Sequence, residues 1–90
     1  MIELTLTQTH SAFPHKFEGV DSQGIYWAVV LRFSRLEIGG GSSWVEAAAN
    51  RTVRREISEV QLTESELRAE FPQHELTIVN GTWRTFPVLV

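Results

Sequence analysis

Cysteine is absent from the chain of 90 residues, and apolar runs are short. Without cysteine, the sequence excludes disulfide frameworks, thiol nucleophiles and zinc sites with thiolate ligands. Small secreted domains usually depend on disulfides, so we expect a cytoplasmic protein. The longest apolar run, residues 25–31, is far shorter than the roughly 20 residues of a membrane-spanning helix. The first ten residues alternate in polarity and include Glu3, which predicts no signal peptide.

Positive charge is scarce as well. Eight basic residues oppose eleven acids, which gives a net charge of −3. This sign disfavours a protein that binds DNA over its whole surface, and the value is too small for an acidic mimic of nucleic acid. Lys16 is the only lysine, so the other basic residues are arginines, which suit bidentate pairing with carboxylate or phosphate.

The remaining composition is that of an ordinary globular domain. Hydrophobic residues make up 42% of the chain, which excludes a disordered tail. Ninety residues leave room for one hydrophobic core, so we expect a single domain over residues 1–90. No internal repeat or linker divides the sequence.

The N-terminal part of the sequence predicts three strands. Ile2, Leu4 and Leu6 alternate with polar residues, which is the period of a strand with one wet face. A short strand over residues 16–20 leads into a turn at residues 21–24, which runs from Asp to Gly. Residues 25–36 are rich in aromatic and β-branched side chains and predict one long central strand. We expect these three strands to form an antiparallel meander.

A helix is predicted after the glycine-rich residues 39–43, which we interpret as the loop that ends the meander. Ser43 and Glu46 have the spacing of a capping box. Apolar residues then recur at helical spacing and predict a helix that extends to about residue 60. This apolar stripe consists of Val45, Ala49, Val53, Ile57 and Val60.

The C-terminal third predicts a second helix and a hairpin. Thr63 and Glu66 again match a capping box, and Pro72 ends the helix that they begin. Residues 74–79 and 82–90 predict two strands around the turn Asn80-Gly81. The predicted fold class is therefore α+β. We expect a single two-layer domain in which an antiparallel sheet (a β-meander and a C-terminal β-hairpin) carries two helices on one face.

One segment resembles a known family. The residues Arg55-Glu56-Ile57-Ser58-Glu59 resemble the core of the Nudix hydrolases, which hold a divalent metal on helix carboxylates, and Gly40 and Glu46 have the spacing of that family. The match departs from the family pattern at three places. The gap from Glu46 to Arg55 is one residue too long, Val60 stands in place of the second acid of the family's pair, and the glycine that follows in the family is absent. The resemblance implies a metal-dependent hydrolase with a degenerate Nudix-like helix, which we keep as the third hypothesis.

Other candidate chemistry is weaker still. The glycine-rich loop lacks the Gly-Lys-Ser/Thr ending of a phosphate-binding loop. His10, His15 and His74 have no spacing that predicts convergence on zinc, and Asp21 is the only Asp. We therefore expect no enzyme activity, no cofactor and no metal.

Two surfaces are candidates for binding a partner. Arg51, Arg54 and Arg55 lie opposite the apolar stripe of the predicted first helix, and Arg51 has no acid three or four residues away. Trp83 and Arg84 follow the predicted hairpin turn and are residue types common at binding hot spots. The strand over residues 82–90 is apolar on more than one face, so as an edge strand it would pair with a second copy or with a foreign strand.

These observations predict a small non-enzymatic module that binds one larger protein. Cofactor-free proteins of this size often act as stoichiometric inhibitors, as phage anti-defence proteins and toxin-immunity proteins do. A homodimer through the C-terminal strand is kept open, and no membrane is expected. The alternative is a nucleic-acid-binding accessory protein that uses the Arg51/Arg54/Arg55 helix face, although the net charge disfavours it.

Overall fold

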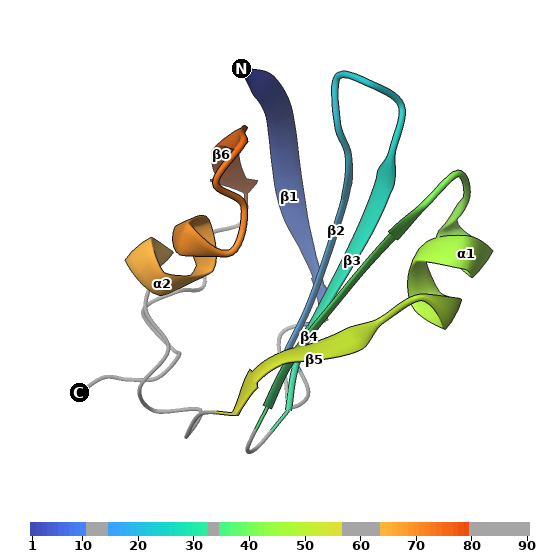
Figure 1. Ribbon diagram of the computed structural model, residues 1–90, viewed down its shortest axis with the longest axis vertical. Coiled ribbons are helices and arrows are strands. Elements are labelled where there is room, and N and C mark those ends of the chain that lie inside the picture. The colour runs from blue at the N-terminus through green and yellow to red at the C-terminus, as the bar shows by residue number, and fades with distance from the viewer. Residues whose placement is uncertain (11–14, 33–34, 57–63, 80–90) are drawn as a thin grey trace.

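A computed structural model describes residues 1–10, 15–32, 35–56 and 64–79. Within this part of the chain, one six-stranded mixed sheet carries two short helices, which agrees with the expected α+β class (Figure 1). The elements in chain order are β1 (Ile2–His10), β2 (His15–Val20), β3 (Tyr26–Leu31), β4 (Arg35–Gly41), α1 (Trp44–Ala49), β5 (Thr52–Glu56), α2 (Glu64–Ala69) and β6 (His74–Val79). The strand order across the sheet is β5-β4-β3-β2-β1-β6.

The first strands form as their sequence pattern predicts. In β1, Leu4 and Leu6 are buried, whereas the alternate side chains Glu3, Thr5 and Thr7 are exposed. β2 ends in the predicted turn, in which the Gly24 amide donates to the Asp21 carbonyl (2.9 Å). Gly24 has a φ of 84°, a conformation that favours glycine. The turn depends on neighbouring residues alone, and the alternation of β1 is already visible in the local sequence.

The single strand predicted for residues 25–36 is wrong. This segment belongs to two antiparallel strands, β3 and β4, and the Arg32 amide donates to the Arg35 carbonyl between them (2.9 Å). The meander therefore has four strands, because β4 continues it through the glycines at residues 39–41. The prediction failed because no Gly or Pro marks the connection between the two strands.

The glycines that predicted a loop lie in β4, where they pair with β3, and α1 packs directly on Gly39 and Gly41. A Cβ atom at Gly39 would lie 2.2 Å from the Ala47 carbonyl oxygen and 2.6 Å from the Arg51 nitrogen. Only glycine permits this approach between strand and helix. The predicted cap is present, since Ser43 Oγ accepts from the Glu46 amide (3.1 Å). The Glu46 carboxylate instead accepts from the Ser42 amide (2.8 Å) and hydroxyl (3.0 Å), and these hydrogen bonds lower its pKa.

The long helix predicted to extend to about residue 60 is wrong as well. α1 ends at Ala49, and the Asn50 side chain donates to the Gly40 carbonyl (3.0 Å). Residues 52–56 form the edge strand β5, which pairs antiparallel with β4. Hydrogen bonding to the open edge of β4 outweighs the helical periodicity. Val45 and Val53, two members of the predicted apolar stripe, are consequently exposed.

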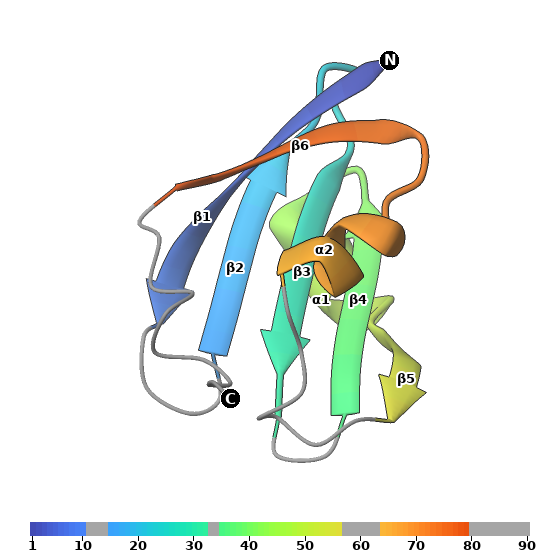
Figure 2. The same ribbon diagram turned by 90° about the vertical axis from the view of Figure 1, so that its left-hand side faces the viewer.

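The main core lies between one face of the sheet and α2. It consists of Leu4, Leu6, Phe17, Val29, Leu31, Leu36, Ile38, Leu67, Phe71 and Leu76. α1 covers part of the opposite face, on the side of β4 that presents Gly39 (Figure 2). The predicted two-layer arrangement with both helices on one face is therefore wrong. The six-residue α1 buries Ala47 against glycines and needs no share of the main core.

β6 closes the other edge of the described sheet. It pairs with β1 in parallel, from Ile2↔His74 to Thr7↔Val79, so the sheet is mixed and not purely antiparallel. The predicted turn at Asn80-Gly81 and the strand over residues 82–90 lie outside the described residues. Over the described ranges, neither helix is long and apolar enough to cross a membrane.

Candidate functional site

Asp21 connects three elements from the end of β2. Its Oδ1 atom accepts from the Gln23 amide (2.8 Å) and the Ile25 amide (3.0 Å), which closes the turn. Its Oδ2 atom accepts from Trp27 Nε1 (3.0 Å) in β3 and lies 3.1 Å from His74 Nε2 at the start of β6. One carboxylate thus links the turn, the centre of the sheet and the segment that follows α2.

The hydrogen bonds decide the charge of Asp21. Burial of the carboxyl raises its pKa, but donation from Trp27, Ile25, His74 and Gln23 outweighs this effect and lowers the pKa to about 2. Asp21 is therefore ionised at neutral pH, and Nε2 of His74 donates a proton to it. In a neutral imidazole this leaves the lone pair on Nδ1.

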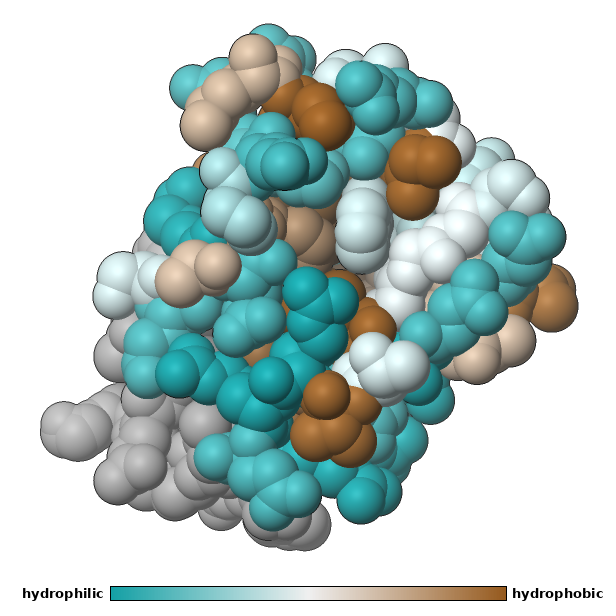
Figure 3. Space-filling view, in the orientation of Figure 1, coloured by the Kyte–Doolittle hydropathy of each residue, from teal (hydrophilic) through white to brown (hydrophobic). Residues whose placement is uncertain are grey.

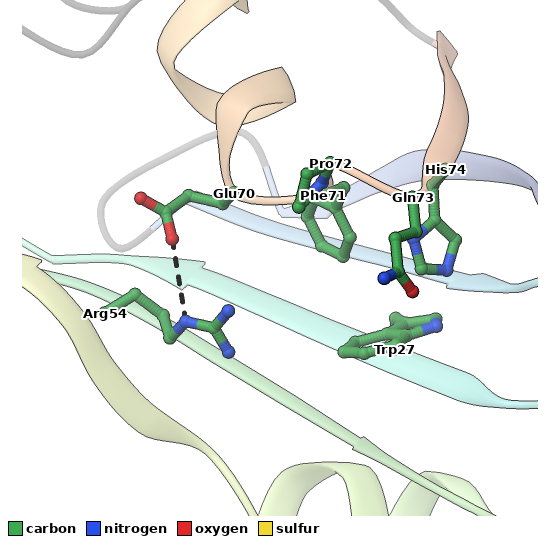
Figure 4. A pocket seen from close by; sticks show the side chains of 7 residues that line it. All are labelled: Trp27, Arg54, Glu70, Phe71, Pro72, Gln73 and His74. Atoms are coloured by element: carbon green, nitrogen blue, oxygen red, sulfur yellow. Dashed lines mark ion pairs between the residues drawn. The ribbon is translucent and has the colours of Figure 1, made fainter.

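A small pocket lies next to this pair (Figure 4). It has a volume of about 160 Å³ and is lined by Trp27, Arg54, Glu70, Phe71, Pro72, Gln73 and His74. The indole of Trp27 forms its floor and stands nearly perpendicular to the Phe71 ring, with the ring centres 5.3 Å apart. Trp27 can lie flat because its partner in β4 is Gly40, where a Cβ atom would come within 2.9 Å of the indole.

The size and the accessibility of the pocket limit its chemistry. Its volume is close to that of cavities that hold one benzene molecule and is below the range of most ligand sites. The Nδ1 atom of His74 is buried and has no hydrogen-bond partner among the described residues. A general base must reach the proton that it abstracts. The buried position of Nδ1 therefore favours a structural role for the pair of His74 and Asp21.

Two of the predicted arginines, Arg54 and Arg55, border the pocket side of the sheet. The register between β4 and β5 shifts so that Leu36 pairs with Arg55 and Glu37 pairs with Val53, which leaves Arg54 as the extra residue of a β-bulge. The bulge allows both arginines to reach α2 and the residue after it. Arg54 Nε lies 3.5 Å from Glu70 Oε1, and Arg55 pairs with Glu66 (3.7 Å) and Glu70 (3.9 Å).

The third predicted arginine, Arg51, joins a separate group that we call the Glu37 cluster: Glu37, Arg32, Arg35 and Arg51. The Glu37 Oε2 atom lies 3.0 Å from Arg35 Nε and 3.2 Å from Arg32 Nε, and Oε1 lies 3.4 Å from Arg51 Nε. The Glu37 side chain is 11% exposed. Three guanidinium groups therefore share one nearly buried carboxylate.

The predicted arginine helix face does not exist. Arg54 and Arg55 lie in the strand β5, and Arg51 precedes it. The three arginines pair with acids on different elements, so they are divided between two clusters. The sequence shows no acid within four residues of Arg51. Its partner Glu37 lies fourteen positions earlier and comes close to it only because the chain folds into paired strands. Trp83 and Arg84 lie outside the described residues.

The exposed side of α1 presents an apolar surface. We define the α1 surface as Trp44, Val45, Ala48 and Ala49, all of which are exposed. Val45 is 79% exposed and Trp44 is 42% exposed. Trp44 stands edge-on against Tyr26, with the ring centres 4.7 Å apart, so its position is set by β3. In Figure 3, brown and tan atoms appear at the right-hand rim of the molecule, where α1 lies, next to pale and hydrophilic surface.

The histidines do not come together. His15 is buried at the start of β2, with its Nδ1 atom 3.3 Å from Gln8 Nε2, and burial together with the nearby His10 lowers its pKa. His74 lies beside Asp21, at the other end of the six-residue strand β2. Among the described residues, no group of three or more His, Asp or Glu side chains is placed to hold a metal ion.

The Nudix-like reading fails in its local structure. The family's acids lie on one helix, but here Glu46 lies in α1, and Arg55 and Glu56 lie in β5. Residues 57–60 are outside the described ranges. Because the carboxylates do not share a helix face, the resemblance carries no further argument.

Sequence reasoning missed two features. Arg32 and Arg35 were not singled out as a cluster, although both closely precede Glu37 in the sequence. The alternation Arg35-Leu36-Glu37 is itself a strand signal. The contact between His74 and Asp21 joins residues 53 positions apart, and no local pattern predicts it. Comparison with known proteins adds no assignment: no family model, no curated protein and no solved structure matches the chain.

Proposed function

We propose that the protein is a non-enzymatic binding module that makes a stoichiometric contact with one larger protein, in the manner of an inhibitor. The observation that carries this proposal is the α1 surface. A six-residue helix holds Trp44 and Val45 toward solvent, whereas its opposite side is seated on the glycines of β4. Exposed apolar side chains outside the core add little to the stability of the isolated domain, and a contiguous group of them marks an interaction surface.

The type of side chain also favours a protein partner. Trp is common among the few residues that dominate the energy of protein interfaces. Contact with Tyr26 restricts the Trp44 ring, so binding would cost little side-chain entropy. The Glu37 cluster lies next to α1. Arg51 follows this helix in the chain, and Glu37 lies in β4 close to Gly39, on which α1 packs. Its arginines favour a partner whose apolar patch borders acidic residues.

The test compares matched variants. The wild-type protein is immobilised and used to capture proteins from a lysate of the source cells, in parallel with Trp44→Ala and Val45→Glu. The control is Val79→Glu, which places the same charge on an exposed valine of β6. We expect one larger protein to bind the wild type and the control at 1:1 stoichiometry by light scattering, and we expect both α1 variants to lose at least about tenfold in affinity.

Two outcomes would overturn the proposal. Equal binding of that protein to all variants would show that α1 is not the contact surface. Capture that disappears after nuclease treatment, or that falls log-linearly with salt, would instead support the nucleic-acid alternative. Circular dichroism of each variant separates lost binding from lost folding, since Trp44 and Val45 are exposed and their substitution leaves the core intact.

A further inference from the structure

The Glu37 cluster has more positive charge than its own acid can neutralise. Three arginines surround one carboxylate, which leaves an excess of two positive charges at this place in a chain whose net charge is −3. Within the described residues, no second acid forms an ion pair with these arginines. Glu56, the register partner of Arg35 on β5, is exposed, and none of the ion pairs among the described residues joins it to these arginines.

The arginines on the other face provide an internal comparison. Arg54 and Arg55 pair with Glu66 and Glu70, so two cations meet two anions. The fold therefore balances one arginine group and leaves the other unbalanced. Like charges held a few ångströms apart repel one another, and an anion bound beside these arginines would reduce that repulsion.

Hydrogen bonding shows the same excess. A guanidinium group carries five N–H donors, whereas one carboxylate offers about four acceptor positions. The Nε atom of Arg51 is buried and, within the part of the chain that the structure describes, has no hydrogen-bond partner, although it lies 3.4 Å from Glu37 Oε1. The arginine side chains remain 27–50% exposed, so a small anion can reach their outer nitrogens without unfolding the domain.

We propose that the Glu37 cluster is a binding site for a phosphate group, in which Glu37 holds Arg32, Arg35 and Arg51 in place and their terminal N–H groups bind the phosphate oxygens. A phosphate dianion carries two negative charges, which match the excess of two positive charges in the cluster. Planar guanidinium groups bind its oxygens in bidentate geometry. Monovalent anions leave the cluster half neutralised. The site therefore prefers phosphate and sulfate to acetate and chloride. This inference goes beyond the proposed function, because the site requires no protein partner.

The experiment follows the Nε–Hε signals of the arginines by two-dimensional NMR while sodium phosphate is added at constant ionic strength. We expect the signals of Arg32, Arg35 and Arg51 to shift along one saturating curve, and those of Arg54 and Arg55 to stay in place. Sodium acetate should cause smaller shifts. Phosphoserine replaces inorganic phosphate in a parallel titration, and tighter binding of phosphoserine would identify a phosphate ester as the natural ligand.

Three variants make the test specific. Arg35→Gln should weaken phosphate binding about fivefold or more, because it removes one of three charges at short range. Arg54→Gln, on the other face, should leave it unchanged. Glu37→Gln removes the negative charge that competes with phosphate but keeps a side-chain oxygen that accepts from the arginines, so it should tighten phosphate binding. Shifts that are linear and equal for all arginines, or an equal loss in Arg35→Gln and Arg54→Gln, would overturn the proposal. Arg35 is half exposed, so its substitution leaves the fold intact even if Glu37→Gln does not fold.

Discussion

The imidazole of His74 and the carboxylate of Asp21 meet at 3.1 Å, although 53 positions separate them in the sequence. This contact joins the turn after β2 to the start of β6. It also fixes the position of the Trp27 indole. Trp27 donates to the same carboxylate and stands nearly perpendicular to the imidazole of His74, with the ring centres 5.5 Å apart. The ionised Asp21 side chain therefore holds together the Trp27 floor of the pocket, the start of β6 and the turn after β2.

Asp21 should make stability depend on pH in the acid range. Its pKa is lowered from 3.8 to about 2 in the folded state, so the folded form binds its proton less readily than the unfolded form does. The resulting stabilisation of about 2 kcal/mol is present above pH 4–5 and is lost as the pH falls toward 2. Urea denaturation followed between pH 7 and pH 2 measures this change.

The variant Asp21→Asn isolates the Asp21 contribution. Asn cannot carry the charge, and its amide donors face the donors of Trp27 and His74, so we expect it to be less stable by about 2 kcal/mol or more at pH 7. Its stability should also fall less between pH 5 and pH 2 than that of the wild type. The same acid dependence in both proteins would show that Asp21 is not the responsible group.

Gly39→Ala should destabilise the protein because α1 lies too close to β4 for a methyl group. The added Cβ atom would meet the backbone of Ala47 and Arg51 at 2.2–2.6 Å, so α1 would have to move as a unit. We expect a loss of about 1–3 kcal/mol, measured by chemical denaturation. Gly24→Ala is the control: it meets no atom within 4 Å and should cost about 1 kcal/mol through its positive φ alone. A smaller effect at Gly39 than at Gly24 would contradict the packing of α1.

Leu67→Ala and Val45→Ala test which helix supports the core. Leu67 of α2 is fully buried, so its truncation should cost about 2–5 kcal/mol. Val45 of α1 is 79% exposed, so its truncation should change stability by less than about 0.5 kcal/mol. Thermal unfolding measures both. A large loss from Val45→Ala would instead support the long amphipathic helix that the sequence pattern predicts.

The local sequence determined the features that depend on a few neighbouring residues. The alternation of Leu4 and Leu6 specifies which face of β1 is buried, the Asp-to-Gly pattern specifies the turn at residues 21–24, and Ser43 with Glu46 specifies where α1 begins. In the turn and the helix cap the partner atoms lie within about four residues, so propensity and hydrogen bonding act without the rest of the fold.

Tertiary structure alone decided the rest. Residues 52–56 have helical periodicity, yet they form β5 because β4 offers an unpaired edge, and the bulge at Arg54 then sends two arginines to α2 and leaves Arg51 with Glu37. Residues 39–41 form a strand because they pair with β3, and glycine at positions 39 and 41 leaves room for α1. Strand pairing and close packing act between segments that are distant in sequence, and their energies exceed the differences of a few tenths of a kcal/mol per residue that local propensity provides.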